Sequence, residues 1–234
     1  LKAYGKTTDL TVMGGAQYVH TFDKCFFMPS DLTAGLEYNR DRLKDNMWGY
    51  DRHTDQTVNI YSAFLQNEWK NDRWGILIGG RLDKHNMVDN VIFSPRANLR
   101  FNPTQNINLR LSYSSGFRAP QAFDEDMHIE NVGGTVAMIE RAKNLKEEKS
   151  QSFSASADMY HRFGVFQTNF LIEGFYTRLT DVFVLGEPYD RGDGILVKTR
   201  SNGPGAKVMG LTLEGKVAYL SILQIQAGLT LQRS

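Results

Sequence analysis

The densest group of residues that could do chemistry lies in the stretch FDEDMHIE, which holds Asp124, Glu125, Asp126, His128 and Glu130. Carboxylate oxygens bind Ca²⁺ when their spacing lets one loop wrap the ion, as in D-x-D-x-D-G loops. Here the three acids are consecutive, and no glycine within the stretch supplies the turn. The stretch therefore favours a solvated acidic loop, and we expect no metal site.

Other catalytic arrangements are equally hard to place. The histidines are scattered along the chain, at His20, His53, His85, His128 and His161. None forms an H-x-x-x-H pair, and the single cysteine, Cys25, has no cysteine partner. The sequence therefore contains no pattern typical of a zinc site. The serines of 150–156 recur at every second residue and lack a G-x-S-x-G context. We therefore expect neither enzymatic activity nor a cofactor.

The elements that position these residues show a repeat of two. In NINLRLSYS, Ile107, Leu109, Leu111 and Tyr113 share one face of a strand, and Arg110 lies on the other with small polar residues. We expect about ten such strands and no helix of comparable quality. They are Leu10–His20, Ser30–Asn39, Val58–Lys70, Trp74–Asp83, Arg96–Asn102, Asn106–Ser114, Ser150–His161, Phe166–Thr177, Val208–Tyr219 and Gln224–Gln232. The predicted fold is all-β, an antiparallel up-and-down meander.

Short and long connections alternate between these strands. The short ones are Asn71–Arg73, Asn102–Gln105, Arg162–Gly164 and Ser221–Ile222, and the long polar ones are Arg40–Thr57, Lys84–Phe93, Gly116–Lys149 and Arg178–Ile195. Alternate connections of a meander emerge at opposite ends of the sheet, so one end should carry all the long links. The segment Asn202–Ala206 preserves this alternation if it is a bulge inside one long strand, and we interpret it so.

Composition narrows the function classes. The 27 basic and 26 acidic residues nearly cancel, which argues against a nucleic-acid partner. Mean hydropathy is -0.40 and no apolar run approaches the ~20 residues of a transmembrane helix, which excludes a helical membrane bundle. A transmembrane β-barrel stays open because its strands are only half apolar. Alternation alone also fits a soluble sandwich, but short turns at one end and long loops at the other favour an outer-membrane barrel.

Several motifs in order resemble the barrel of TonB-dependent outer-membrane receptors. They are YSAFLQNEWK, GGRLDKH, FSPRANLRFNPTQNINLRLSYS, the following SGFRAP, NLKEEKSQSFSASADM, GFYTRLTDVF and SNGPGAKVMGLTLEG. Two positions depart from the family pattern: Glu147 stands where proline is usual, and Thr212 where glutamate is common. The chain opens at Leu1 without a signal and ends at Ser234 inside an alternating run. We therefore interpret residues 1–234 as an internal part of one barrel domain.

The resemblance implies a barrel of about 22 strands that holds a plug domain of the same chain. It implies active uptake of a scarce, bulky small-molecule nutrient across the outer membrane of a Gram-negative bacterium. The energy would come from the TonB complex, acting through an N-terminal region that this chain lacks. An iron chelate such as a siderophore, haem or a cobalamin-type ligand is the leading expectation. A glycan importer of the same family and a passive porin remain alternatives, and outer-membrane lipid is an expected partner in each case.

The same resemblance makes Leu109–Ser114 a membrane strand and Gly116–Lys149 an extracellular loop. Gly116 lets the chain leave the ladder, and Pro120 lacks the donor needed to continue it. We expect Phe117 and Arg118 to pack at the loop base.

Binding residues are expected in the long loops, because loops of this length are usually functional. The predicted ligand contacts are Trp48, Tyr50, Phe123, Asp124, Glu125 and His128. Trp69 and Trp74 lie beside a short turn instead, where aromatic side chains suit a lipid interface.

Overall fold

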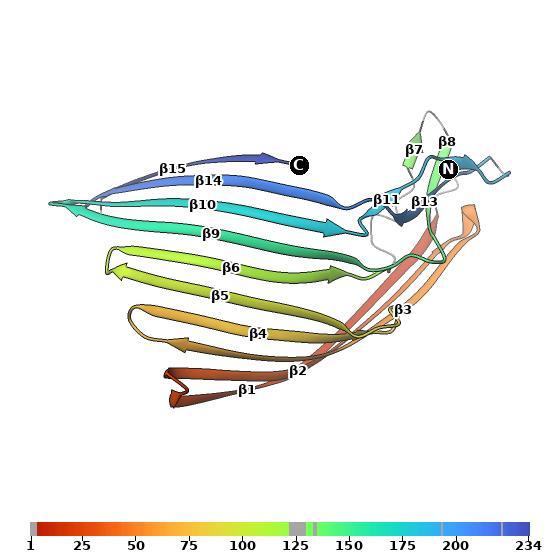
Figure 1. Cartoon of the computed structure of the whole chain (residues 1–234). Coiled ribbons are helices and arrows are strands. Elements are labelled where there is room, and N and C mark those ends of the chain that lie inside the picture. The colour runs from red at the N-terminus through yellow and green to blue at the C-terminus, as the bar shows by residue number, and fades with distance from the viewer. Residues whose placement is uncertain (1–3, 122–129, 133–134, 193, 221) are drawn as a thin grey trace.

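Ten long strands form one antiparallel sheet in chain order (Figure 1). The computed structural model describes residues 4–121, 130–132, 135–192, 194–220 and 222–234. The strands are β1 (Gly5–Cys25), β2 (Met28–Met47), β3 (Arg52–Lys70), β4 (Trp74–His85), β5 (Ile92–Thr104), β6 (Ile107–Arg118), β9 (Glu148–Phe163), β10 (Phe166–Thr180), β14 (Ala206–Tyr219) and β15 (Leu223–Arg233). The predicted up-and-down meander is confirmed.

All ten predicted strands are present, and most extend beyond their predicted ends. The clearest difference concerns Arg40–Thr57, which was expected to be a long link. Strands β2 and β3 continue through most of it, and only Trp48–Asp51 separates them, with Trp48–Tyr50 forming the 3-10 helix η1. The sequence suggested a polar link here because charged residues occupy both faces of this extension of the strands. Across the strands they pair instead, with Asp55 lying 3.6 Å from Arg42 and 3.4 Å from Lys44.

A second, smaller sheet gathers at the end of the long links. It has the order β11 (Phe183–Leu185), β13 (Leu196–Asn202), β8 (Thr135–Arg141) and β7 (Glu130–Val132), and β12 (Tyr189–Asp190) also pairs with β13. Strands β8 and β13 run parallel, although they belong to different links. Within the part of the chain that is described, no helix has the length and apolarity of a membrane-spanning helix.

The interpretation of Asn202–Ala206 as a bulge in one strand was wrong. Strand β13 belongs to the second sheet and β14 to the main one, and the chain turns between them. The Gly203 N–H donates to the carbonyl oxygen of Val182 at 2.7 Å, and an added Cβ would come within 2.7 Å of the Val184 side chain. This close approach requires glycine at the turn. Because β11, β12 and β13 all lie between β10 and β14, the link from β10 to β14 is still long, but the strict alternation fails at the short connection between β2 and β3.

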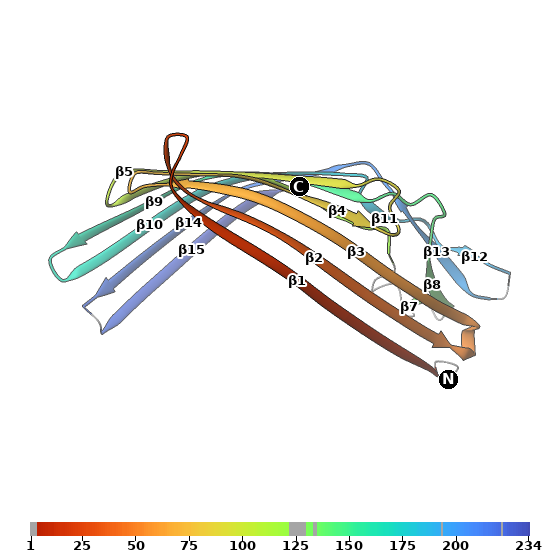
Figure 2. The ribbon, with the colours of Figure 1, turned by 90° about the horizontal axis from the view of Figure 1, so that it is seen from below.

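The main sheet has one apolar and one polar face. Phe101, Leu109 and Ala157 are register partners on the first, and Arg100, Arg110 and Ser156 on the second. The sheet twists, so that β1–β3 diverge from β9–β15 (Figure 2). No other element covers the apolar face in the described residues, and Leu111 remains 55% exposed. The buried hydrophobic residues lie instead at the long-link end.

Aromatic residues gather near the short turns, on the apolar face. Trp69 donates its indole N–H to the carbonyl oxygen of Cys25 at 3.0 Å, and its ring stacks on Phe27. Trp74 stacks on Phe101 with ring centroids 4.3 Å apart. These positions are consistent with the interfacial role expected for both tryptophans, which stays a prediction.

The base of the longest link is packed and pinned. Phe117 contacts a cluster of the buried residues Val88, Ile92 and Ala119, which come from the link between β4 and β5, the start of β5 and the link after β6. The Arg118 guanidinium lies over the ring of Phe183, 5.7 Å from its centroid. The expected role of Phe117 and Arg118 at the loop base is confirmed.

His85 joins two links at this base. Its side chain is fully buried; Nδ1 accepts a hydrogen bond from the Met87 backbone N–H at 3.0 Å. Nε2 therefore carries the proton and donates to Oε1 of Gln121, 3.3 Å away. Burial lowers the pKa of His85, against the opposing effects of the hydrogen bond to Gln121 and the charge of Asp83. The neutral imidazole is therefore the form of His85 that its burial and its two hydrogen bonds favour.

Two predictions follow from these faces and this base, and the first concerns lipid. Leu111→Arg in the intact protein should lower the free energy of unfolding by about 2–4 kcal/mol, because it places a cation on the face expected to meet lipid, further than Leu109 from the aromatic residues near the short turns. Arg110→Ala should cost much less, since the polar face is wet. Urea unfolding in lipid vesicles measures both, and equal costs would contradict the assignment of the faces.

The second prediction concerns pH at the loop base. The folded-state pKa of His85 is below its ordinary 6.5, so the unfolded segment binds the proton first as pH falls. Local stability should therefore be complete above about pH 6.5 and decrease below it. Hydrogen exchange of the Met87 amide, corrected for its intrinsic rate, should show less protection at lower pH. His85→Gln should remove this dependence; persistence of the dependence in that variant would disprove the assignment.

Candidate functional site

The long links are joined into one structured unit. In the parallel pair of β8 and β13, Met138 is 2% exposed and Val197 is fully buried. The neighbouring backbone also connects the two links, since the Ala142 N–H donates to the carbonyl oxygen of Arg200 at 2.9 Å. The link after β6 and the link after β10 therefore form a single packed layer.

A polar cleft of about 700 Å³ opens between this layer and the tip of β2 and β3. One wall is the segment Asp51–Thr54, and the other is Met138–Lys143 with Leu145. Met87, Pro120 and Arg191 complete the lining. Segments far apart in the sequence thus build one cleft, on elements that hydrogen bonds and packing hold in place.

Cations outnumber anions in the lining of the cleft. The cations are Arg52, Arg141, Lys143 and Arg191, with His53 as a titratable neighbour, and the anions are Asp51 and Glu140. Arg191 lies 3.9 Å from the Glu140 carboxylate. Guanidinium groups suit oxygen-rich, anionic groups because they donate several hydrogen bonds in a fixed geometry.

The described contacts fix several of these cations in position. The Arg52 guanidinium pairs with the buried Asp45 carboxylate at 2.7 Å, and Asp45 also accepts a hydrogen bond from Thr7 at 2.6 Å. The Arg141 guanidinium donates to the carbonyl oxygen of Pro120 at 2.9 Å. Lys143 is exposed on the rim of the cleft. The cleft therefore combines anchored guanidinium groups with an accessible ammonium.

The polar face of the main sheet continues away from this end with its own charged network. Arg81 lies 2.7 Å from the Glu37 carboxylate and 2.8 Å from that of Asp83. Asp83 is buried, and the Ser62 hydroxyl donates to it at 2.6 Å. A second polar hollow, of about 530 Å³, includes Glu37, Arg81 and Arg96 in its lining. A polar ligand would meet compatible groups along this face.

The predicted contacts fall only partly within the described residues. Trp48 is in η1 at the tip of β2 and β3, where its ring is 49% exposed and stacks on Tyr4 with centroids 6.1 Å apart. Tyr50 is in the same turn, and its side chain lies outside what the structure describes. The remaining four predicted contacts lie outside the described residues: Phe123, Asp124, Glu125 and His128.

The cations of the cleft were missed from the sequence. They are spread over three links, with no more than two in any one of them, whereas the acidic stretch was prominent because its charges are consecutive. A signal was present in RAK, where Arg141 and Lys143 follow a short apolar run. Among the described residues, no group of three or more His, Cys, Asp or Glu side chains could hold a metal ion.

Solved structures share this fold at low sequence identity. The siderophore receptor PirA from Pseudomonas aeruginosa aligns with a TM-score of 0.79 and 17% identity, over 98% of this chain and 43% of that one. The ferric enterobactin receptor PfeA from Pseudomonas aeruginosa, in complex with enterobactin, gives 0.72 and 18%, over 98% and 36%. The FrpB iron transporter from Neisseria meningitidis gives 0.69 and 16%, over 97% and 36%.

The chain therefore spans less than half the length of these solved proteins. No curated protein matches it. A family model does match, the one described as "TonB dependent receptor-like, beta-barrel", over residues 3–234. The resemblance drawn from the sequence motifs is thereby confirmed, and this chain belongs to the β-barrel family of TonB-dependent receptors.

Proposed function

We propose that this chain is part of an outer-membrane receptor that imports an iron chelate with energy from the TonB complex. The observation that carries the proposal is the family match over residues 3–234. The solved proteins that share the fold are named as siderophore, ferric enterobactin and iron receptors or transporters, which favours iron chelates as the ligand class.

The physical form of the sheet supports this proposal. An apolar face in register over ten strands suits contact with lipid, and the opposite polar face suits a wet lumen. Neither edge strand, β1 or β15, has a second partner within the described residues, so closure requires further strands. We propose that residues 1–234 contribute part of one barrel domain. Further sequence of the same protein would supply the other strands, the plug and the segment that binds TonB.

We place first contact with the ligand at the cleft between Asp51–Thr54 and Met138–Lys143. The excess of cations suits a chelate with acidic oxygen donors. Six residues of the flanking links complete the proposed binding surface: Trp48, Tyr50, Phe123, Asp124, Glu125 and His128. Trp48 supports this placement because its exposed ring lies on the same strand tip as one wall of the cleft.

Transport by the full-length protein tests the proposal. Expressed in a Gram-negative host that lacks its own iron-chelate receptors, the protein should allow saturable uptake of a radiolabelled ferric chelate. Deletion of the host TonB should abolish the uptake, because the family draws its energy through that protein. Haem, cobalamin and an oligosaccharide serve as competing ligands in the same assay. Uptake that rises linearly with concentration and ignores the TonB deletion would establish a passive pore instead.

Charge reversal at the cleft tests the placement of the ligand. Lys143→Glu in the full-length protein should weaken binding of an anionic ferric catecholate by about threefold to tenfold, because an exposed charge contact contributes about 1 kcal/mol. Lys146→Glu is the matched control, since Lys146 is exposed on the same link but does not line the cleft. A neutral ferric hydroxamate should respond weakly to both. Equal loss for the two variants in a binding titration would move the site away from the cleft.

A further inference from the structure

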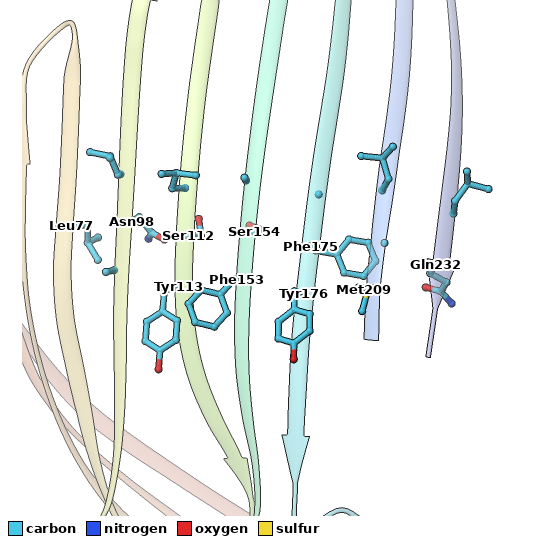
Figure 3. Close-up of a pocket in the computed structure, with 18 of the residues that line it drawn as sticks. Leu77, Asn98, Ser112, Tyr113, Phe153, Ser154, Phe175, Tyr176, Met209 and Gln232 are labelled. Atoms are coloured by element: carbon cyan, nitrogen blue, oxygen red, sulfur yellow. The ribbon is translucent and has the colours of Figure 1, made fainter. Parts of the chain in front are cut away.

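Two hollows of the molecule differ in how they can respond to acid. An apolar hollow of about 1180 Å³ lies on the face expected to meet lipid, where Figure 3 shows the rings of Tyr113, Phe153 and Tyr176 side by side. Its described lining contains no histidine and no carboxylate, so it has no group that titrates between about pH 5 and 8. The polar cleft differs, because His53 lines it and His85 contacts its wall.

His85 joins two segments that line the cleft. Met87 is one of the lining residues, and its backbone N–H donates to Nδ1 of the buried His85 ring at 3.0 Å. Pro120 is another, and the next residue, Gln121, accepts a hydrogen bond from Nε2 of His85 at 3.3 Å. One imidazole thus connects the link between β4 and β5 to the link after β6, beside the cleft.

The second of these contacts extends to a guanidinium group of the cleft. The Pro120 carbonyl oxygen accepts a hydrogen bond from Arg141 at 2.9 Å. The Gln121 N–H donates to the carbonyl oxygen of Ala119 at 2.9 Å, and Ala119 belongs to the buried cluster at the loop base. The position of Arg141 therefore depends on the segment that His85 holds.

Asp83 is the carboxylate that faces His85, since residues two apart on a strand share a face. Burial lowers the pKa of His85, and the hydrogen bond to Gln121 and the charge of Asp83 oppose this effect. Asp83 is itself compensated, because it lies 2.8 Å from Arg81 and accepts a hydrogen bond from Ser62 at 2.6 Å. Its charge is therefore a weak support for a protonated ring.

Within the described residues, the other elements packed around His85 contribute neutral or cationic side chains. These are Ile60 on β3, Asn39 on β2, Lys84 on β4, and Gln121 and Arg141 in the link after β6. Glu140, next to Arg141, lies 3.9 Å from Arg191 instead. Burial thus determines that the ring is neutral near pH 7.

Protonation of His85 removes one of its two contacts. A neutral imidazole accepts a hydrogen bond at one nitrogen and donates at the other, whereas both nitrogens of the protonated ring donate. The bond to Gln121 survives this change, but Nδ1–H then meets the N–H of Met87. The ring also carries a charge in a buried place, which is unfavourable without full compensation. Movement of Met87 away from the ring relieves both effects and alters the cleft that Met87 lines.

We propose that His85 is a positioning residue for the cleft and that its protonation in a mildly acidic medium weakens ligand binding there. This inference rests on the proposed function and adds control by protons to the same site. His53 acts in the opposite direction, because a protonated imidazole in the lining attracts an anionic ligand. The two histidines therefore predict opposite slopes of affinity against pH.

Titration of the purified full-length receptor with a ferric catecholate, at about pH 7.5 and about pH 5, tests the proposal. In His85→Asn, the side-chain oxygen can accept the Met87 hydrogen bond at either pH. On acidification the wild type should lose about fivefold more affinity than this variant, as is typical of coupling between two sites. Protonation of the ligand and of His53 affects both proteins equally. His20→Asn, an exposed histidine on β1, is the control and should follow the wild type. Parallel profiles for His85→Asn and the wild type would overturn the proposal.

A second variant moves the response instead of removing it. Gln121→Glu places a carboxylate beside Nε2 and so raises the pKa of His85. The loss of affinity should then begin at a higher pH than in the wild type, which a role in packing alone does not predict. An unchanged midpoint would contradict the proposal, even if His85→Asn does not fold.

Labelling without ligand separates this proposal from the identity of the ligand. A receptor for another ligand class binds the catecholate at neither pH, which counts against the proposed function alone. Met87→Cys, in a Cys25→Ser background, can be labelled with a maleimide in the empty receptor. Acid should increase its labelling relative to the same cysteine combined with His85→Asn, because the wall opens only when the ring is protonated. Equal labelling in the two proteins would disprove the role of His85.

Discussion

The register of the main ladder is the constraint on which everything else depends. Side chains alternate along each strand, so a slip of one residue would exchange the two faces of that strand. The observed pairing keeps Leu99, Leu111 and Ala155 on one side over successive strands. The same pairing places Arg81 near Glu37 and Asp83 on the other side. One set of backbone hydrogen bonds therefore creates both a surface suited to lipid and a surface suited to water.

The long-link end is built differently from the rest of the sheet. Most of the buried hydrophobic side chains are found here, because the apolar face of the main sheet has no protein layer over it. His85, Phe117 and the parallel pair of β8 and β13 hold links from different parts of the chain together. Such packing gives the cleft walls a fixed geometry. A preformed site avoids part of the entropy cost of ordering loops during binding.

At the long-link end, charged side chains are paired differently on the two sides of the sheet. Toward the cleft, Arg52 is anchored by the buried Asp45, so its position is set by the protein itself. On the outward side, Arg178 and Lys207 face each other without a described carboxylate between them.

The sequence by itself determined the ten strands, their faces and the family, because alternation and ordered motifs are local signals. The sequence-based prediction was wrong at Arg40–Thr57, where charged residues on both faces conceal the extension of two strands. It was also wrong at Asn202–Ala206, where a glycine turn separates strands of two sheets. Only the tertiary structure decided the second sheet and the cleft. Its parallel pair joins links separated by about two strands, and the cations Arg52, Arg141 and Arg191 meet from three links. No local sequence pattern predicts that these residues lie close together, since their proximity depends on long-range pairing and packing between loops.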